Sequence, residues 1–280
     1  MAHDKESGIL ARHRVPLDPG GCVDLGAIDP SSTAELGRDA KDRAHKKLRM
    51  DQERLDELQV RLFAESKRSL LIVLQAMDTG GKDGTIRSVL GPLNAQGVRV
   101  QNFKKPTEEE AAHHFLWRIR KALPAKGMIG VFNRSHYEDI LVPAVYGTLP
   151  ADKVAGRYEE INEFERGLAA EGATVVKFFL HISREEQKRR LQDRLDDPEK
   201  RWKFNPADLK TRERWPAFMK SYGKILSRTS TVWAPWHIIP ADKKWYRDFL
   251  VGRILRRVLD GMRPRFPKAP KGLEDTPIPD

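Results

Sequence analysis

The sequence predicts an α/β fold built on a parallel five-stranded sheet that is flanked by helices. Five short apolar runs alternate with stretches of helical pattern, as in successive βαβ units. A glycine-rich turn follows the first apolar run directly. The expected strands cover residues 70–75, 98–103, 127–133, 174–182 and 236–241, and the expected helices between them cover 83–94, 107–122, 135–145 and 152–171.

The chain divides into three parts by composition. Residues 1–40 are rich in Gly, Pro, Asp and Ser and predict an irregular arm. Residues 41–262 carry the alternating pattern and form the main domain. This domain is entered through an amphipathic helix over 39–67, in which leucines recur near helical spacing among charged residues. The Pro-rich residues 263–280 predict a loose tail.

The composition bounds the class of protein. With 280 residues, of which 32% are charged and 39% hydrophobic, the chain is expected to be soluble and to bury one large core, or one core with an appended lobe. No apolar run is long enough to span a membrane, and the first residues lack the apolar stretch of a secretory signal. The only cysteine, Cys22, excludes an internal disulfide. These features favour a reducing compartment, the cytoplasm.

The formal net charge of +11 raises the question of a partner. Basic proteins attract polyanions such as nucleic acid, anionic membranes or highly phosphorylated small molecules. A solvated basic surface explains the same charge equally well. The position of the cations therefore matters more than their number.

The strongest motif is "LLIVLQAMDTGGKDGTIR", residues 70–87, a variant of the phosphate-binding loop G-x-x-x-x-G-K-[ST]. Gly81 and Lys82 match, whereas Ala76 replaces the first glycine and Asp83 replaces the Ser or Thr. A strand that runs through such a turn into a helix aims backbone amides and a helix N-terminus at one anion. The alternative is a glycine-rich turn with a solvated lysine. The predicted phosphate-binding residues of this loop are Gly80, Gly81, Lys82, Asp83, Gly84 and Thr85.

The loop also predicts a metal ligand. The Ser or Thr that usually holds Mg²⁺ is absent from this variant, so a carboxylate is expected to hold the metal instead. Asp78, inside the loop, is the nearest candidate.

A second motif, "GMIGVFNRSHYEDIL" at residues 127–141, places polar side chains at the end of the third expected strand. Asn133 and Arg134 then lie at the carboxyl edge of the sheet, where ligands of open α/β folds bind. The guanidinium of Arg134 can bridge phosphates. Alternatively it pairs only with a structural acid, Glu138 or Asp139. Ser135 and Glu138 have the spacing of a helix capping box.

Residues 184–230 interrupt the alternation between the fourth and fifth strands. The stretch is too long for one crossover helix, contains many Arg and Lys residues and is split by Pro198. An arginine-rich helical segment beside a phosphate-handling sheet indicates a mobile lid. A surface helical hairpin with solvated charges is the alternative.

Four stretches resemble the polyphosphate kinase 2 family. They are "QAMDTGGKDGTIR", "FKKPTEEEAAHHFLWRIRKALPAKGMIGVFNRSHYEDILV", "KFFLHISREEQKRRLQDRLDDPEKRWKFNPADL" and "APWHIIPADKKWYR", and the likeness covers residues 40–262. The resemblance implies a P-loop kinase-like core, similar to thymidylate kinase, with a helical lid over 184–230. It also implies phosphoryl transfer between inorganic polyphosphate and a nucleotide, dependent on Mg²⁺, for which Mn²⁺ can substitute.

The resemblance implies roles for single residues. Asp78 matches the family's loop aspartate, which positions metal and the accepting phosphate, and Lys82 matches its Walker A lysine. Arg134 matches an arginine at the strand end. Arg194 matches a lid arginine that closes over the transferring phosphate. These four are the predicted catalytic residues.

Asn133 stands where many family members have Asp, and in this respect the chain resembles the subgroup expected to phosphorylate both AMP and ADP. Asn133 and Arg134 join the predicted nucleotide-binding set. A track for the polyphosphate chain is predicted along Lys104, Lys105, Arg118 and Arg120. The implied partners are polyphosphate and AMP, ADP or ATP, in a homodimer or homotetramer, without nucleic acid or membrane.

Two other functions compete with this one. An ordinary nucleoside monophosphate kinase that uses ATP would have the same fold, but the altered loop and the excess of basic residues argue against it. A degenerate P-loop module that binds nucleic acid is the second. No helix-turn-helix or RNA-binding signature is visible, and the cations are interleaved with acidic residues.

Overall fold

A parallel five-stranded sheet forms the centre of the protein in the computed structural model, which describes residues 8, 11–17, 21–33, 36, 40–273, 276 and 278–279. The strands are β1 (Ser69–Ala76), β2 (Val98–Asn102), β3 (Ile129–Asn133), β4 (Ala173–His181) and β5 (Trp236–Pro240). Their order in the sheet is β2-β3-β1-β4-β5, and every neighbouring pair is parallel. The predicted fold class is confirmed.

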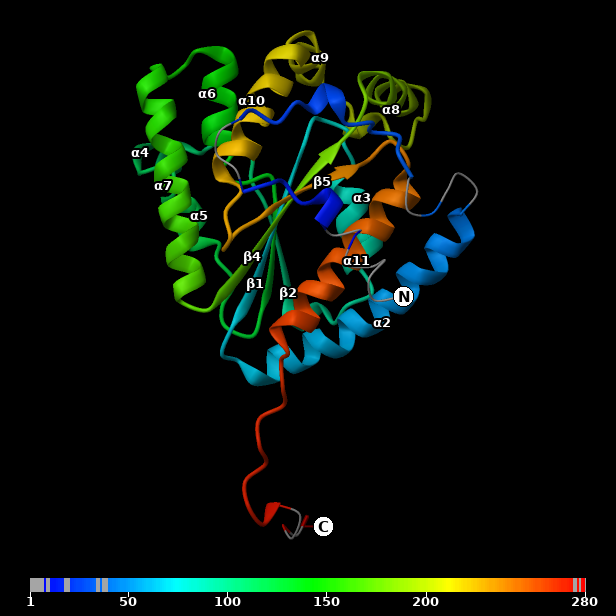
Figure 1. Ribbon diagram of the computed structural model, residues 1–280, viewed down its shortest axis with the longest axis vertical. Helices are drawn as coiled ribbons and strands as arrows, with labels where there is room; N and C mark the ends of the chain where they lie inside the picture. The colour runs from blue at the N-terminus through cyan, green and yellow to red at the C-terminus, as the bar shows by residue number, and fades with distance from the viewer. Residues whose placement is uncertain are drawn as a thin grey trace.

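Helices cover both faces of the sheet, as Figure 1 shows. One face packs against α2 (Lys41–Glu65), α3 (Lys82–Thr85) and α11 (Lys244–Met262). The other packs against α5 (Trp117–Lys121), α6 (Glu138–Tyr146), α7 (Ala151–Ala170) and α10 (Trp215–Thr229). The residues of β1 are buried along its whole length because this central strand is covered from both sides.

The amphipathic helix expected over 39–67 is α2. Its four leucines, Leu48, Leu55, Leu58 and Leu62, are buried, and the helix packs mainly against α11. Asp51 of α2 is buried too. It accepts a hydrogen bond of 2.8 Å from Arg253 of α11 and lies 2.8 Å from Arg256.

Two expected helices are shorter or broken. The helix expected over 83–94 begins as α3 and continues as a single π-helical segment, η2 (Ile86–Leu90). The helix expected over 107–122 is divided into α4 (Glu108–Ala112) and α5. Thr107 and Glu110 form a capping box at the start of α4, which fixes one end of this short element.

The capping box predicted at Ser135 and Glu138 is wrong. Arg134 adopts a left-handed backbone conformation, with φ of 62°, and the chain turns before the helix begins. Glu138 is therefore the first residue of α6, and the Ser135 hydroxyl accepts a bond of 3.3 Å from the Tyr137 amide instead.

The segment 184–230 contains four helical elements, α8 (Arg184–Asp196), the 3₁₀ turn η4 (Arg201–Lys203), α9 (Ala207–Glu213) and α10. Helices α8 and α9 lie above the carboxyl ends of the strands (Figure 1). We refer to residues 184–213 as the lid segment, and to α10 as the helix that returns the chain from it to β5.

The described parts of the first 40 residues pack on the body. Val15 and Leu25 are buried, and the Val15 amide donates a bond of 2.9 Å to the Trp236 carbonyl of β5. A short 3₁₀ turn, η1, covers Leu25–Ala27. At the other end, the chain after α11 leaves the body in an extended course (Figure 1). Among the described residues, no helix is long and apolar enough to cross a membrane.

Candidate active site

A cleft of about 790 Å³ opens at the carboxyl edge of the sheet. Its walls come from the loop between β1 and α3, the ends of β2 and β3, the lid segment and the first turn of α11. Five Lys and five Arg side chains line it against four Asp side chains. The cations expected from the net charge are thus concentrated, in part, around one cavity.

The loop from Asp78 to Gly84 forms the floor of this cleft. A Cβ at Gly80 would lie 2.5 Å from the Ala76 Cβ, and one at Gly81 would lie 2.0 Å from a guanidinium nitrogen of Arg247. Gly81 also has φ of +104°, a conformation that favours glycine. The backbone can therefore approach a ligand closely here. Thr85, the last residue predicted for phosphate binding, is buried behind the loop and does not line the cleft.

Lys82 lies in the first turn of α3. Its ammonium donates a hydrogen bond of 3.1 Å to the carbonyl of Ala76. Burial, together with the nearby Arg134, lowers the pKa of Lys82 to about 8. A phosphate in the cleft would supply the opposite charge and favour the ammonium form.

Arg134 reaches from the end of β3 to the loop, where its guanidinium lies 2.7 Å from the Asp78 carboxylate. Of the two structural partners considered from the sequence, Asp139 is paired with Arg118. Glu138 is half-buried. Loss of solvent raises its pKa, although Arg134 opposes the rise. The observed ion pair joins two of the predicted catalytic residues across the cleft.

Asn133 joins three elements. Its amide nitrogen donates to Asp83 at 2.6 Å and to Asn102 at 2.7 Å, so the ends of β2 and β3 and the start of α3 meet at this side chain. All three residues line the cleft.

The lid segment contributes Arg194, which donates to the Lys203 carbonyl at 3.0 Å and lies 3.4 Å from the Asp208 carboxylate. Burial and the charge of Asp78 raise the pKa of Asp208 to about 6. Arg194 and Asp208 both line the cleft opposite the loop. A lid that closes over the cleft and a surface hairpin both stay predictions for this segment, and the cleft position of Arg194 favours the lid.

Several cleft residues were not expected from the sequence. Arg190 of α8 donates to the carbonyls of Thr79, at 3.0 Å, and Ala241, at 2.6 Å. Arg247 of α11 lies against Gly81 and Gly84 and is paired with Asp248 at 2.7 Å. The basic clusters "QKRRLQDR" and "KKWYRD" are the signal for them. The sequence does not show that Arg190 and Arg247 meet at the same loop, because this depends on how α8 and α11 are placed in the fold.

The four residues predicted for a polyphosphate track are not assembled in one place. Lys104 lines the cleft, whereas its neighbour Lys105 does not. Arg118 is buried and bonds to the Lys104 carbonyl and to Asp139. Arg120 is exposed outside the cleft, with its guanidinium 4.9 Å from the ring centre of Phe164.

The carboxylates of the loop fit a magnesium ion. Mg²⁺ in proteins keeps several waters and takes one or two carboxylates together with substrate phosphates. Asp78 and Asp83 offer two carboxylates at the floor of the cleft. Within the described residues no group of three acidic, His or Cys side chains has the spacing of a metal site. Such a set suits a metal that arrives with its phosphate ligand.

The chain matches known proteins over nearly its whole length. The model of the family polyphosphate kinase 2 (PPK2) matches residues 38–267. The AMP/ADP-polyphosphate phosphotransferase of Meiothermus ruber is 47% identical over 92% of this chain and 96% of its own length. The ADP-polyphosphate phosphotransferase of Rhodopseudomonas palustris is 40% identical over 89% and 90%.

Solved structures agree with the sequence relatives. The crystal structure of polyphosphate kinase 2 from Arthrobacter aurescens TC1 superposes with a TM-score of 0.88 at 44% identity, over 94% of this chain and 92% of that one. The predicted P-loop kinase-like fold and the family resemblance are both confirmed. The chain belongs to the polyphosphate kinase 2 family.

Proposed function

We propose that this protein transfers phosphate reversibly between inorganic polyphosphate and adenine nucleotides, converting AMP to ADP and ADP to ATP. One observation carries the proposal: ten cationic side chains and four Asp side chains enclose a single cleft built on a phosphate-binding loop. A nucleotide and a polyphosphate chain bring many negative charges into one place, and this excess of cations suits both at once.

The chemistry needs little covalent help from the protein. Phosphoryl transfer is catalysed mainly by positioning and by charge around the transferring group. Lys82 would follow the phosphate oxygens from the floor, Arg134 would bind them from the end of β3, and Arg194 would close from the lid segment. Asp78 and Asp83 would hold Mg²⁺, which when bound neutralises phosphate charge.

Asn133 supports the use of two acceptors. AMP and ADP differ by one phosphate, so the cleft must tolerate acceptors of different length and charge. A carboxylate at this position would repel the additional phosphate unless a metal lay between them. The neutral amide avoids that repulsion and, as a donor, can bond to phosphate oxygen. The relative that is 47% identical is named for both AMP and ADP.

The test is to incubate the purified protein with AMP, excess polyphosphate and Mg²⁺ and to follow nucleotides by chromatography. We expect ADP first and ATP afterwards, and no product when EDTA removes the metal. Accumulation of ADP alone would refute the use of both acceptors. A reaction that requires ATP as donor and ignores polyphosphate would identify an ordinary nucleoside monophosphate kinase.

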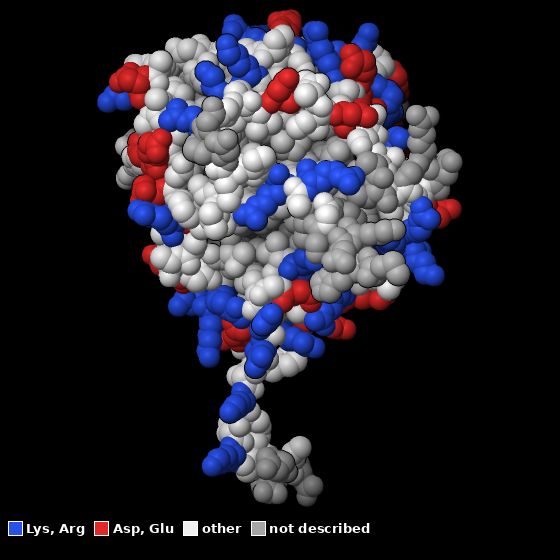
Figure 2. Space-filling model, viewed as in Figure 1, with Lys and Arg blue, Asp and Glu red and all other residues white. Residues whose placement is uncertain are grey.

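The proposal includes the assembly and the compartment of the protein. We propose a homodimer or homotetramer in the cytoplasm that binds neither nucleic acid nor membrane. On the face shown in Figure 2, Lys and Arg side chains are interspersed with Asp and Glu around the body, and further Lys and Arg follow the C-terminal tail. Such interspersed charge gives little support to a nucleic-acid surface on this face.

A further inference from the structure

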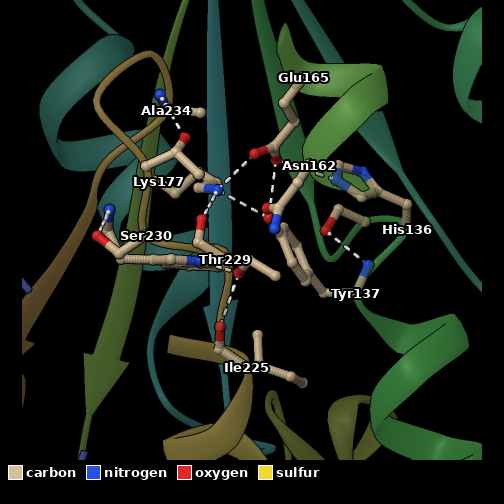
Figure 3. A network of polar contacts seen from close by, with 12 residues as sticks. His136, Tyr137, Asn162, Glu165, Lys177, Ile225, Thr229, Ser230 and Ala234 are labelled. Carbon is tan, nitrogen blue, oxygen red and sulfur yellow. Dashed lines mark hydrogen bonds and ion pairs between the residues drawn. The ribbon is translucent and has the colours of Figure 1, made fainter. Parts of the chain in front are cut away.

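Figure 3 shows a buried cluster of ionisable side chains, none of which lines the cleft. Lys177 of β4 and Glu165 of α7 form an ion pair of 2.5 Å, and both side chains are 0% exposed. Tyr137 and His136, from the turn that follows Arg134, complete the cluster and are also fully buried. We call these four residues the Lys177 network.

Each hydrogen of the Lys177 ammonium has an acceptor. Besides Glu165, the ammonium donates to the Tyr137 hydroxyl at 2.8 Å and to the carbonyl of Thr229 at 2.7 Å. An ammonium group has three donors, so the lysine is satisfied only while all three partners hold their places.

Glu165 is held by the same turn. It accepts from the Tyr137 hydroxyl at 2.8 Å and lies 3.2 Å from the His136 ring nitrogen. Burial raises the pKa of Glu165, but Lys177 and His136 outweigh this effect, so its pKa lies below the ordinary value. Burial lowers the pKa of Lys177, and Glu165 opposes this effect. The 2.5 Å contact between the two side chains has the short length of a charge-assisted hydrogen bond.

The partners of Lys177 come from two segments, the turn after Arg134 and the end of α10. Tyr137 lies three residues after Arg134, which has a left-handed backbone conformation and whose guanidinium is paired with Asp78. Thr229 is the last residue of α10, the helix that returns from the lid segment. The Thr229 hydroxyl also accepts from the Trp236 indole at 2.9 Å. One ammonium thus fixes the turn that carries Arg134 against the end of the lid's return helix.

Helix α10 has a second contact with the reaction centre. Tyr222, two turns before Thr229, donates to the Ala76 carbonyl at 3.1 Å. Lys82 donates to the same carbonyl. A shift of α10 would therefore disturb the bond of Lys177 to Thr229, and with it the turn after Arg134. The same shift would disturb the bond of Tyr222 to Ala76, beside the loop.

We propose that the Lys177 network is a positioning site for phosphoryl transfer, which aligns Arg134 with the lid's return helix. Its members do not touch substrate and act through Arg134. The inference rests on the proposed function. Mere stabilisation of the core is the competing role, and buried ion pairs are often no more stabilising than apolar side chains of similar volume.

The informative variant is Tyr137→Phe. It removes the hydroxyl that joins Lys177 to Glu165, and it keeps the ring that packs at 4.9 Å against Trp236. We expect kcat to fall about 10-fold with KM for ADP changed less than about 2-fold, since a small misplacement of a catalytic group is costly while ground-state binding is retained.

The matched control is Asp51→Asn, which weakens a buried ion-pair cluster between α2 and α11 away from the cleft. It should lower the melting temperature at least as much as Tyr137→Phe and leave kcat within about 2-fold of wild type. Equal losses of kcat in the two variants would mean that activity follows stability alone, and the proposal would fail.

A double-mutant cycle tests the route through Arg134. In an Arg134→Lys background the hydroxyl has no guanidinium to align, so Tyr137→Phe should change kcat less than about 2-fold. The same 10-fold loss in both backgrounds would overturn the proposed route. Wild-type protein is assayed first with polyphosphate and with ATP as donors, and the cycle is run with whichever donor it uses. Failure of the proposed function is therefore seen separately from failure of this inference.

Discussion

At the scale of residues, the site consists of cations held in place by the protein's own acceptors. Lys82 is held by the Ala76 carbonyl, and Arg134 is held by Asp78. Such groups need little reorganisation when phosphate arrives, which is the condition under which charge stabilises a transition state best. The contribution of each cation can be separated by single substitutions.

Lys82→Ala should abolish most of the activity while the fold remains intact. Loss of one preorganised charge at a transferring group typically costs about 3 kcal/mol or more, that is, about 100-fold in kcat. Steady-state assays with ADP and polyphosphate give the rate, and circular dichroism checks the fold. Lys126→Ala, at an exposed lysine outside the cleft, is the control. Activity of Lys82→Ala within threefold of wild type would remove this loop from the reaction.

Asn133→Asp should change the balance between the two acceptors. The new carboxylate would stand against Asp83, whose oxygen now lies 2.6 Å from the Asn133 amide nitrogen. Two like charges at that distance repel unless a cation lies between them. We therefore expect a higher Mg²⁺ requirement and a lower ratio of ADP to AMP use, measured as kcat/KM for each acceptor over a Mg²⁺ titration. An unchanged ratio would mean that Asn133 does not select acceptors.

At the scale of elements, the lid segment is the part that the fold adds to a simple sheet of βαβ units. Arg190 and Arg194 of α8 line the cleft together with Asp193. Arg189 does not line it: its side chain is exposed and pairs with Glu186 and Asp193. Helix α8 therefore allows two arginines to be compared, Arg194 in the cleft and Arg189 outside it.

Arg194→Ala should lower kcat about 10- to 100-fold if the lid segment closes on the transferring phosphate, because the loss concerns the transition state more than ground-state binding. Arg189→Ala, an exposed arginine of the same helix, should leave kcat unchanged. Both variants are assayed with AMP and with ADP, and their melting temperatures are compared. If Arg194→Ala affected only the melting temperature, the surface-hairpin interpretation would be correct.

Some helices, strands and turns could be predicted from the sequence without the structure, and others could not. The five strands and α2 were predictable because their apolar periodicity is a local property of the chain. The glycine-rich turn between β1 and α3 was predictable because its glycines, lysine and flanking elements are contiguous in the sequence. The capping box at Ser135 failed because the left-handed turn at Arg134 delays the helix. In the same turn Arg134 is paired with Asp78 and Tyr137 is bonded to Glu165, and these contacts are tertiary.

The same distinction applies to the site. Asp78, Lys82 and Arg134 stand in recognisable motifs and all line the cleft, although the pair between Arg134 and Asp78 was not predicted. Arg118 was placed on a phosphate track from charge clustering, but Asp139 and the Lys104 carbonyl bind it inside the protein. Arg247 was missed because nothing local to α11 shows that its first turn lies over Gly81. Long-range contacts, not composition, decide which arginines reach the cleft.

At the scale of the whole molecule, charge is the property that links the protein to its substrate. The formal charge is +11, and the cleft has six more cationic than acidic side chains, ten against four. Fields from exposed charges are screened beyond a Debye length of about 10 Å at 0.1 M salt. A long polyanion can interact with the charges of both the cleft and the surrounding surface, whereas a nucleotide can interact with those of the cleft alone.

The final prediction follows from this difference in size. Raising NaCl from about 50 to about 200 mM should raise KM for long-chain polyphosphate about 10-fold or more, because binding of a polyanion releases its condensed counterions and weakens steeply with salt. KM for AMP should rise much less, since fewer charges are involved. Steady-state kinetics at each salt concentration, in one buffer, give KM for AMP, for long-chain polyphosphate and for tripolyphosphate as a short donor. If both donors lost affinity by the same factor, contacts outside the cleft would contribute nothing, and the basic surface would be only a solvated one.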